Sequence, residues 1–175
     1  MTLNQTQKNM VAACQEVLRW CDRNEVGQDK PGYTPRHRLQ RIAIMTIMTE
    51  SGGHMYANAN IPTSLKIPHD AIGSDHHSVG MFQQQVGSDG SNAFGWGTVQ
   101  QCMDINHSVD AFLRALKNKD LHWWRGPVLW LRCQYVQISA FPDGSNYERN
   151  FERAKFFIDD REIRLAIRGK QLETN

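Results

Sequence analysis

The segment 35–50 constrains the fold more than any other part of this sequence. As a helix it would be apolar around most of its circumference, through Leu39, Ile42, Ala43, Ile44, Met45, Ile47 and Met48. Such a helix has to be surrounded by other elements. Thr34–Pro35 supplies an N-cap followed by a proline at the first helical position, and Ser51-Gly52-Gly53 is a stop signal directly after Glu50. We therefore expect a buried central helix that ends at Glu50.

Further helices are predicted on both sides of this one. The segment 5–24 has apolar residues at the three- and four-residue spacing of an amphipathic helix. Helical patterns return later in the chain at 98–104, 108–118, 127–141 and 146–168. Residues 51–97 contain most of the chain's 13 glycines and no regular strand alternation, and so long a loop region inside a compact domain is usually functional. We expect one mainly α domain that spans residues 1–175.

The composition excludes several classes of protein. With 40% hydrophobic and 22% charged residues, the chain can build a core and is not a disordered protein. A net charge of +2 lacks the concentrated basicity of a nucleic-acid binder, and no stretch approaches the roughly 20 apolar residues of a membrane span. The polar N-terminus has no secretion signal. We expect a protein made in the cytoplasm, with no nucleic-acid partner and no membrane partner.

The cysteines predict neither a zinc site nor a disulfide framework. Cys14, Cys21, Cys102 and Cys133 form no CxxC pair and no Cys/His spacing typical of zinc. Proteins made in a reducing cytoplasm keep their thiols free and mostly buried. We expect four free thiols.

Glu50 is the first candidate for chemistry. A carboxyl group at the C-terminal end of an apolar helix is disfavoured in its charged form by burial and by the helix dipole, and both raise its pKa. A carboxylic acid that stays protonated near neutral pH can donate a proton to a glycosidic oxygen. The alternative is a solvated glutamate at a frayed helix end.

A second candidate element is Ser78-Val79-Gly80-Met81-Phe82-Gln83-Gln84. Its glycine allows a close backbone approach, and its two carboxamides offer the paired donors and acceptors that suit sugar hydroxyl and acetamido groups. The alternative is a short buried segment with polar flanks.

Three ordered motifs resemble the goose-type lysozyme and soluble lytic transglycosylase superfamily. They are Glu50-Ser51-Gly52, then Gly80-Met81-Phe82-Gln83, then the stretch Ile138–Gly144. The stretch from Ile67 to Thr98 is similar to the version of this domain found in lysins and tape-measure proteins of phages that infect mycobacteria and related actinobacteria. Together the motifs cover roughly residues 35–147. The resemblance implies a lysozyme-like fold whose glycine-rich loop region lines the substrate groove.

The resemblance also implies roles for individual residues. Glu50 would be the general acid, and the element Gly80–Gln84 would form the floor of the sugar groove. Where the family has Tyr-Asn this chain has Phe141-Pro142, so a hydroxyl near the acid is missing unless Tyr147 replaces it. Asp75 lies near the position at which goose-type lysozymes place a second acid.

Asp75 decides between two reactions. As a general base it would activate water and give hydrolysis with inversion. Without a base, the 6-hydroxyl of the sugar would close on the anomeric carbon, as in a lytic transglycosylase. The alternative for Asp75 is a loop-stabilising Asx turn, and we favour hydrolysis slightly.

The remaining candidates come from the same middle region. Trp96 is the best of the candidate sugar-stacking tryptophans, whereas Trp124 and Trp130 are expected in the core, and Trp123 stays open. Asn58 and Asn60 could hydrogen-bond an acetamido group or form turns. A metal site built from His69, Asp70, Asp75, His76 and His77 is disfavoured by geometry, because adjacent histidines project apart, so we expect no metal and no cofactor.

The sequence thus predicts a phage endolysin-type glycosidase. It would cleave the β-1,4 bond between N-acetylmuramic acid and N-acetylglucosamine in peptidoglycan, act as a monomer at the cell wall, and reach it through a holin pore. The alternatives are a lytic transglycosylase, a non-catalytic virion or wall-binding domain of the same fold, and a metal-dependent hydrolase. The candidate site residues are Glu50 and Asp75 for catalysis, with Asn58, Asn60, Ser78, Gly80, Met81, Phe82, Gln83, Gln84, Trp96 and Tyr147 for substrate binding.

Overall fold

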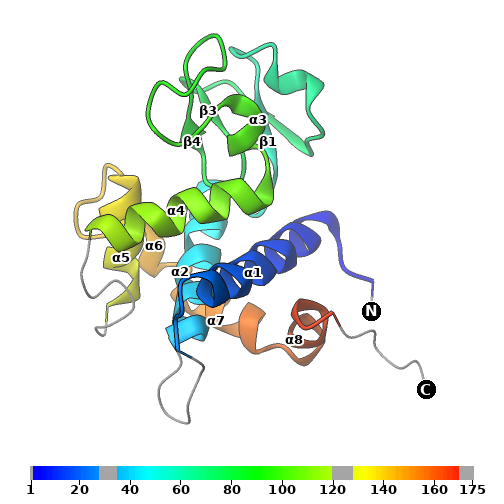
Figure 1. Ribbon diagram of the computed structural model, residues 1–175, viewed down its shortest axis with the longest axis vertical. Coiled ribbons are helices and arrows are strands. Elements are labelled where there is room, and N and C mark those ends of the chain that lie inside the picture. Colours follow the sequence, from blue (N-terminus) through cyan, green and yellow to red (C-terminus); the bar gives the residue numbers. More distant parts are fainter. Residues whose placement is uncertain (1, 28–34, 120–127, 170–175) are drawn as a thin grey trace.

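The central helix is where the apolar pattern predicts it. A computed structural model describes residues 2–27, 35–119 and 128–169 (Figure 1). In it, helix α2 (Pro35–Glu50) packs against α1 (Gln5–Arg23), α5 (Leu129–Gln137) and α7 (Phe151–Asp159). Its apolar residues from Leu39 to Ile47 are fully buried. The predicted cap at Thr34 lies outside the described residues.

The mainly α character of the chain is confirmed. Helix α1 begins with a capping box, in which Asn4 and Gln7 satisfy each other's backbone N–H groups. Helix α4 (Ile105–Lys119) packs against α1 and α5, and it crosses the molecule between the other helices and a lobe of loops and short strands (Figure 1). We call residues 51–103 the loop lobe.

The loop lobe contains regular structure that the sequence pattern does not reveal. Strand β1 (Tyr56–Asn58) pairs in parallel with β2 (Ala71–Gly73), and β3 (Ser78–Val79) pairs antiparallel with β4 (Gln84–Gln85). Between and after them lie the 3₁₀ helix η1 (Ser64–Lys66) and the short helix α3 (Val99–Cys102). Strands of two or three residues are too short to show alternation, which is why the sequence has no regular strand pattern here.

The C-terminal helices are shorter than expected. Helix α5 ends at Gln137 and not at residue 141, because Ile138 adopts the left-handed conformation with φ 52°. The expected helix 146–168 is three helices, α6 (Ser145–Glu148), α7 and α8 (Arg161–Ile167). Asp160 separates the last two: its backbone is extended, and its side chain accepts hydrogen bonds from the N–H groups of Glu162 and Ile163.

One hydrophobic core joins the helices to the loop lobe. It runs from Met10 in α1 to Ile167 in α8 and includes Val79, Met81 and Phe82 of the lobe. The four cysteines, all among the described residues, are buried and are not joined by disulfide bonds. In the part of the chain that the structure describes, no helix is both long and apolar enough to span a bilayer.

Candidate active site

Glu50 is the last residue of α2, at the point where the central helix leaves the core for the loop lobe. The helix stops there because Ser51 Oγ bonds the carbonyl of Ile47 and accepts from the N–H of Gly53. Gly52 and Gly53 then take positive φ values of 63° and 91°. The stop signal therefore fixes the carboxyl at the end of a buried helix, as expected.

The Glu50 carboxyl is partly buried and has one close partner. The hydroxyl of Tyr147, in α6, donates a hydrogen bond to Glu50 Oε1 at 2.6 Å. Burial raises the pKa of Glu50 above its ordinary value of 4.5; the hydrogen bond from Tyr147 lowers it in part, and the negative charge of Asp75 raises it further. Burial also raises the pKa of Tyr147, so its phenol remains a donor. Tyr147 thus supplies the hydroxyl that Phe141-Pro142 lacks.

A cavity of about 500 Å³ opens beside this pair. Its wall comes from the end of α2, the loop lobe, the last residue of α4, the segment around the end of α5, and α6. The lining residues are Glu50, Asp75, Ser78, Gln83, Gln85, Phe94, Trp96, Lys119, Val136, Gln137, Ile138, Ser139 and Tyr147. We call this space the acid cavity. Five of the predicted site residues besides Glu50 line it: Asp75, Ser78, Gln83, Trp96 and Tyr147.

Asp75 is an exposed carboxylate in the turn between β2 and β3. The buried carboxamide of Asn58 holds this turn by donating to the carbonyls of Asp75 and Ser78, at 2.8 and 3.0 Å. Asn60 donates in the same way to the carbonyls of Ser74 and His76. Both asparagines therefore position the Asp75 turn, and neither lines the acid cavity.

Most of the element Gly80–Gln84 is buried and does not line the cavity. Met81 and Phe82 are buried, and Phe82 stacks on Phe112 of α4 with ring centroids 4.7 Å apart. Gln84 is buried too and donates to the carbonyl of Ser108. Of the five residues only Gln83 lines the cavity, with φ 49° and its side chain bonded to the Gly80 carbonyl.

Gly80 allows two backbone segments of the protein to approach each other closely, whereas the sequence pattern links this glycine to a sugar-binding element. It has φ +74°, and a side chain there would overlap the carbonyl oxygen of Cys102. The contact is between two parts of the loop lobe, and it locks the Gly80–Gln84 element to α3.

Of the four candidate tryptophans, the structure describes Trp96 and Trp130, which lie in different places. Trp96 lines the acid cavity, and its carbonyl lies 3.0 Å from His107 Nε2 of α4. Trp130 packs against the core and meets Phe151 edge to face. Trp123 and Trp124 lie outside the described residues.

The histidines and aspartates proposed as metal ligands do not converge. Within the described ranges, no three His, Cys, Asp or Glu side chains form a group that could hold a metal ion. Asp70 instead accepts from the N–H of Met55 and from Asn9, and contacts His54. Its carboxylate is a structural tie between α1 and the loop lobe.

Several cavity residues were not among the predicted ones. Lys119, Gln137 and Ile138 are brought to the cavity by the packing of α4 and α5, and no local pattern marks them in the sequence. Ile138 was quoted only as part of a motif. Phe94, two residues before Trp96 in the chain, also lines the cavity and was not predicted.

No protein-family model matches this chain, and no curated protein matches its sequence. What the chain does has therefore to be inferred from the chemistry of the acid cavity.

Proposed function

We propose that this protein is a glycosidase that cleaves the β-1,4 bond between N-acetylmuramic acid and N-acetylglucosamine in peptidoglycan, with Glu50 as the general acid. One observation carries the proposal. The carboxyl with the raised pKa is held by Tyr147 in a cavity that also contains an exposed carboxylate, Asp75. An acid whose pKa is raised, opposite an ionised carboxylate, is the pair that glycoside hydrolysis uses.

The chemistry assigns a separate task to each group. Protonated Glu50 transfers its proton to the glycosidic oxygen as the bond between that oxygen and the anomeric carbon breaks. Tyr147 then stabilises the carboxylate that remains by donating to Oε1. Trp96 offers an aromatic face to a pyranose ring, and Gln83 and Ser78 offer polar groups to its substituents.

Asp75 favours hydrolysis over transglycosylation. Its exposed carboxylate can take a proton from water as that water attacks the anomeric carbon, which gives inversion. A transglycosylase needs no such base, because the 6-hydroxyl of the sugar attacks and leaves a 1,6-anhydro end. The resemblance to phage lysins suggests that the enzyme acts on the wall of an actinobacterial host.

Mass spectrometry of muropeptides tests the proposal. Purified actinobacterial peptidoglycan is digested with the wild type, with Glu50→Gln and with Asp75→Asn. We expect reducing N-acetylmuramic acid ends from the wild type, and a rate lowered about 10²- to 10⁴-fold by Glu50→Gln. Asp75→Asn is expected to lose hydrolysis as well.

Other outcomes select the alternatives. Anhydro products, 18 mass units lighter for the one water not added, from both the wild type and Asp75→Asn would make the protein a transglycosylase. Loss of activity in a chelator would favour a metal-dependent hydrolase. No products from the wild type would leave a wall-binding domain.

A further inference from the structure

A second cleft lies beside the acid cavity, along α4. This cleft has a volume of about 320 Å³ and shares Phe94, Trp96 and Lys119 with the acid cavity. Its floor is one face of α4, where the small residues Ala111 and Ala115 leave room above the helix. Its wall is the Phe94–Trp96 turn, in which the Phe94 side chain is 57% exposed. We call this space the α4 cleft.

Two cations mark the α4 cleft. Arg114 and Lys119 both line it, and among the described residues that line the acid cavity Lys119 is the one with a cationic side chain. Arg114 Nε contacts Asp110 at 2.8 Å, which orients the guanidinium, while Asp110 also contacts Arg23. Lys119 Nζ donates to the carbonyl of Tyr135. An ammonium has three N–H donors and a guanidinium five, so both groups have donors beyond these contacts.

The charged side chains are therefore divided between the two neighbouring spaces. Glu50 and Asp75 lie at one end, and Arg114 and Lys119 lie along α4. A neutral glycan chain has no charge for the two cations to bind. A carboxylate on the ligand would be repelled by Asp75 and attracted to the α4 cleft.

We propose that the α4 cleft binds the peptide attached to N-acetylmuramic acid, and that Arg114 and Lys119 recognise its carboxylates. This inference rests on the proposed function, because it assigns the charged part of the same substrate. Phe94 and Trp96 stand between the two spaces and contact the sugar that carries the peptide. The enzyme therefore prefers peptide-bearing glycan whose peptide carboxylates are free.

The test compares two soluble glycan fragments that differ only in charge. One bears peptides with free carboxylates, and the other is the same fragment after its carboxylates have been converted to amides. We expect a KM about tenfold lower for the free acid, the size of one charge-assisted hydrogen bond, with kcat little changed. The preference should weaken as salt is added.

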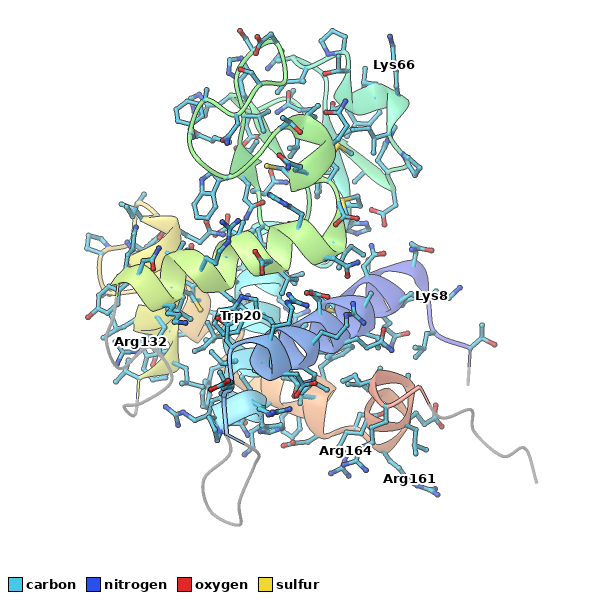
Figure 2. The ribbon with its side chains drawn as sticks, viewed as in Figure 1. Lys8, Trp20, Lys66, Arg132, Arg161 and Arg164 are labelled. Atoms are coloured by element: carbon cyan, nitrogen blue, oxygen red, sulfur yellow. The ribbon has the colours of Figure 1, made fainter. Side chains whose placement is uncertain are left out.

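Two double variants carry the comparison. Arg114→Gln/Lys119→Gln should abolish the preference for free carboxylates, and Arg114→Gln alone should weaken it. Lys66→Gln/Arg161→Gln removes the same charge at the far ends of the molecule (Figure 2) and should keep the preference. Because Lys119 also donates to the Tyr135 carbonyl, melting temperatures are recorded for each variant. The single variant Arg114→Gln tests the cation that does not line the acid cavity.

Direct binding of both fragments to Glu50→Gln separates this inference from the proposed function. Cleavage without any preference between the fragments overturns the inference and leaves the glycosidase standing. Charge-dependent binding without cleavage by the wild type overturns the glycosidase and leaves the cleft as a carboxylate-binding site. If the wild type does not cleave the fragments and Glu50→Gln does not bind them, both the inference and the proposed function are overturned.

Discussion

At the scale of single residues, Glu50 shows how stability and function oppose each other: burial suits the carboxyl to act as an acid but makes its ionised form unfavourable. Its carboxyl is held where ionisation is unfavourable, because burial outweighs the hydrogen bond from Tyr147. A carboxyl whose pKa is higher in the folded protein than in the unfolded chain binds more protons when folded. Its contribution to stability is complete below pH 4.5 and is lost as the pH rises through the folded pKa.

This linkage predicts the pH dependence of Glu50→Gln. The glutamine oxygen can still accept from Tyr147 but has no charge to bury. The variant should be more stable than the wild type at neutral pH, and the advantage should vanish near pH 4. Melting temperatures across that range measure the difference. A difference independent of pH would mean that the folded pKa of Glu50 is not raised.

Tyr147→Phe should move the pH profile of activity. The phenol lowers the pKa of Glu50, so its removal raises that pKa further and shifts the alkaline limb of kcat to higher pH. The lost hydrogen bond should reduce stability by about 1–2 kcal/mol. Rates measured from pH 4 to 9 check the shift, and Tyr135→Phe, which changes a half-exposed tyrosine away from the acid, is the control.

Ile138 is a strained residue at the wall of the acid cavity. It is β-branched, has φ 52° at the end of α5, and is 72% exposed, so little burial offsets the left-handed conformation. Ile138→Gly should stabilise the protein by about 1 kcal/mol, or roughly 2–4 °C in melting temperature. Ile138→Val keeps the strain and should show no gain. Equal melting temperatures for all three proteins would mean that position 138 is unstrained.

At the scale of elements, the loop lobe depends on backbone contacts as well as on side chains. Gly80 N–H donates to the carbonyl of Tyr56 at 2.8 Å, and its Cα lies against the Cys102 carbonyl. These contacts join β1, β3 and α3 into one unit. Each element is too short to be stable alone.

Gly80→Ala should therefore destabilise the protein by about 3 kcal/mol or more, because a left-handed residue acquires a side chain that overlaps a carbonyl. Gly95→Ala is the matched control. Gly95 also has a positive φ, +83°, but a side chain there meets nothing within 4 Å, so only about 1 kcal/mol should be lost. Urea denaturation measures both variants, and equal losses would show that the Cys102 contact is unimportant.

At the scale of the whole molecule, one core joins the helices to the loop lobe. The thiols can test whether the two parts unfold together, because Cys102 belongs to the lobe and Cys14, Cys21 and Cys133 belong to the helices. All four are fully buried, and burial raises the pKa of Cys102 and Cys133 to about 12.

Thiol labelling should therefore follow global unfolding. All four cysteines are expected to react with a disulfide reagent at one common rate under native conditions, and that rate should rise with urea as unfolding does. Peptide mapping of the labelled sites measures each rate separately. Faster labelling of Cys102 alone would mean that the loop lobe opens independently of the helices.

The sequence by itself determined the elements whose cause is local. The apolar circumference of 35–50 and the Ser51-Gly52-Gly53 stop predict both α2 and the position of Glu50, because periodicity and capping act within a few residues. Periodicity alone did not give the ends of α5 and α7, because Ile138 and Asp160 stop helices that the apolar pattern would continue.

Only the tertiary structure decided which side chains face Glu50. The resemblance points to Tyr147 as the residue that replaces a missing hydroxyl, yet its contact with Glu50 joins residues 97 positions apart, and only the fold brings them together. Lys119 and Gln137 reach the cavity only because α4 and α5 pack together. Met81, Phe82 and Gln84, which the sequence offers for substrate binding, are instead buried and do not line the cavity. A site is assembled by the packing of distant segments, and no local pattern records which face of each segment turns inward.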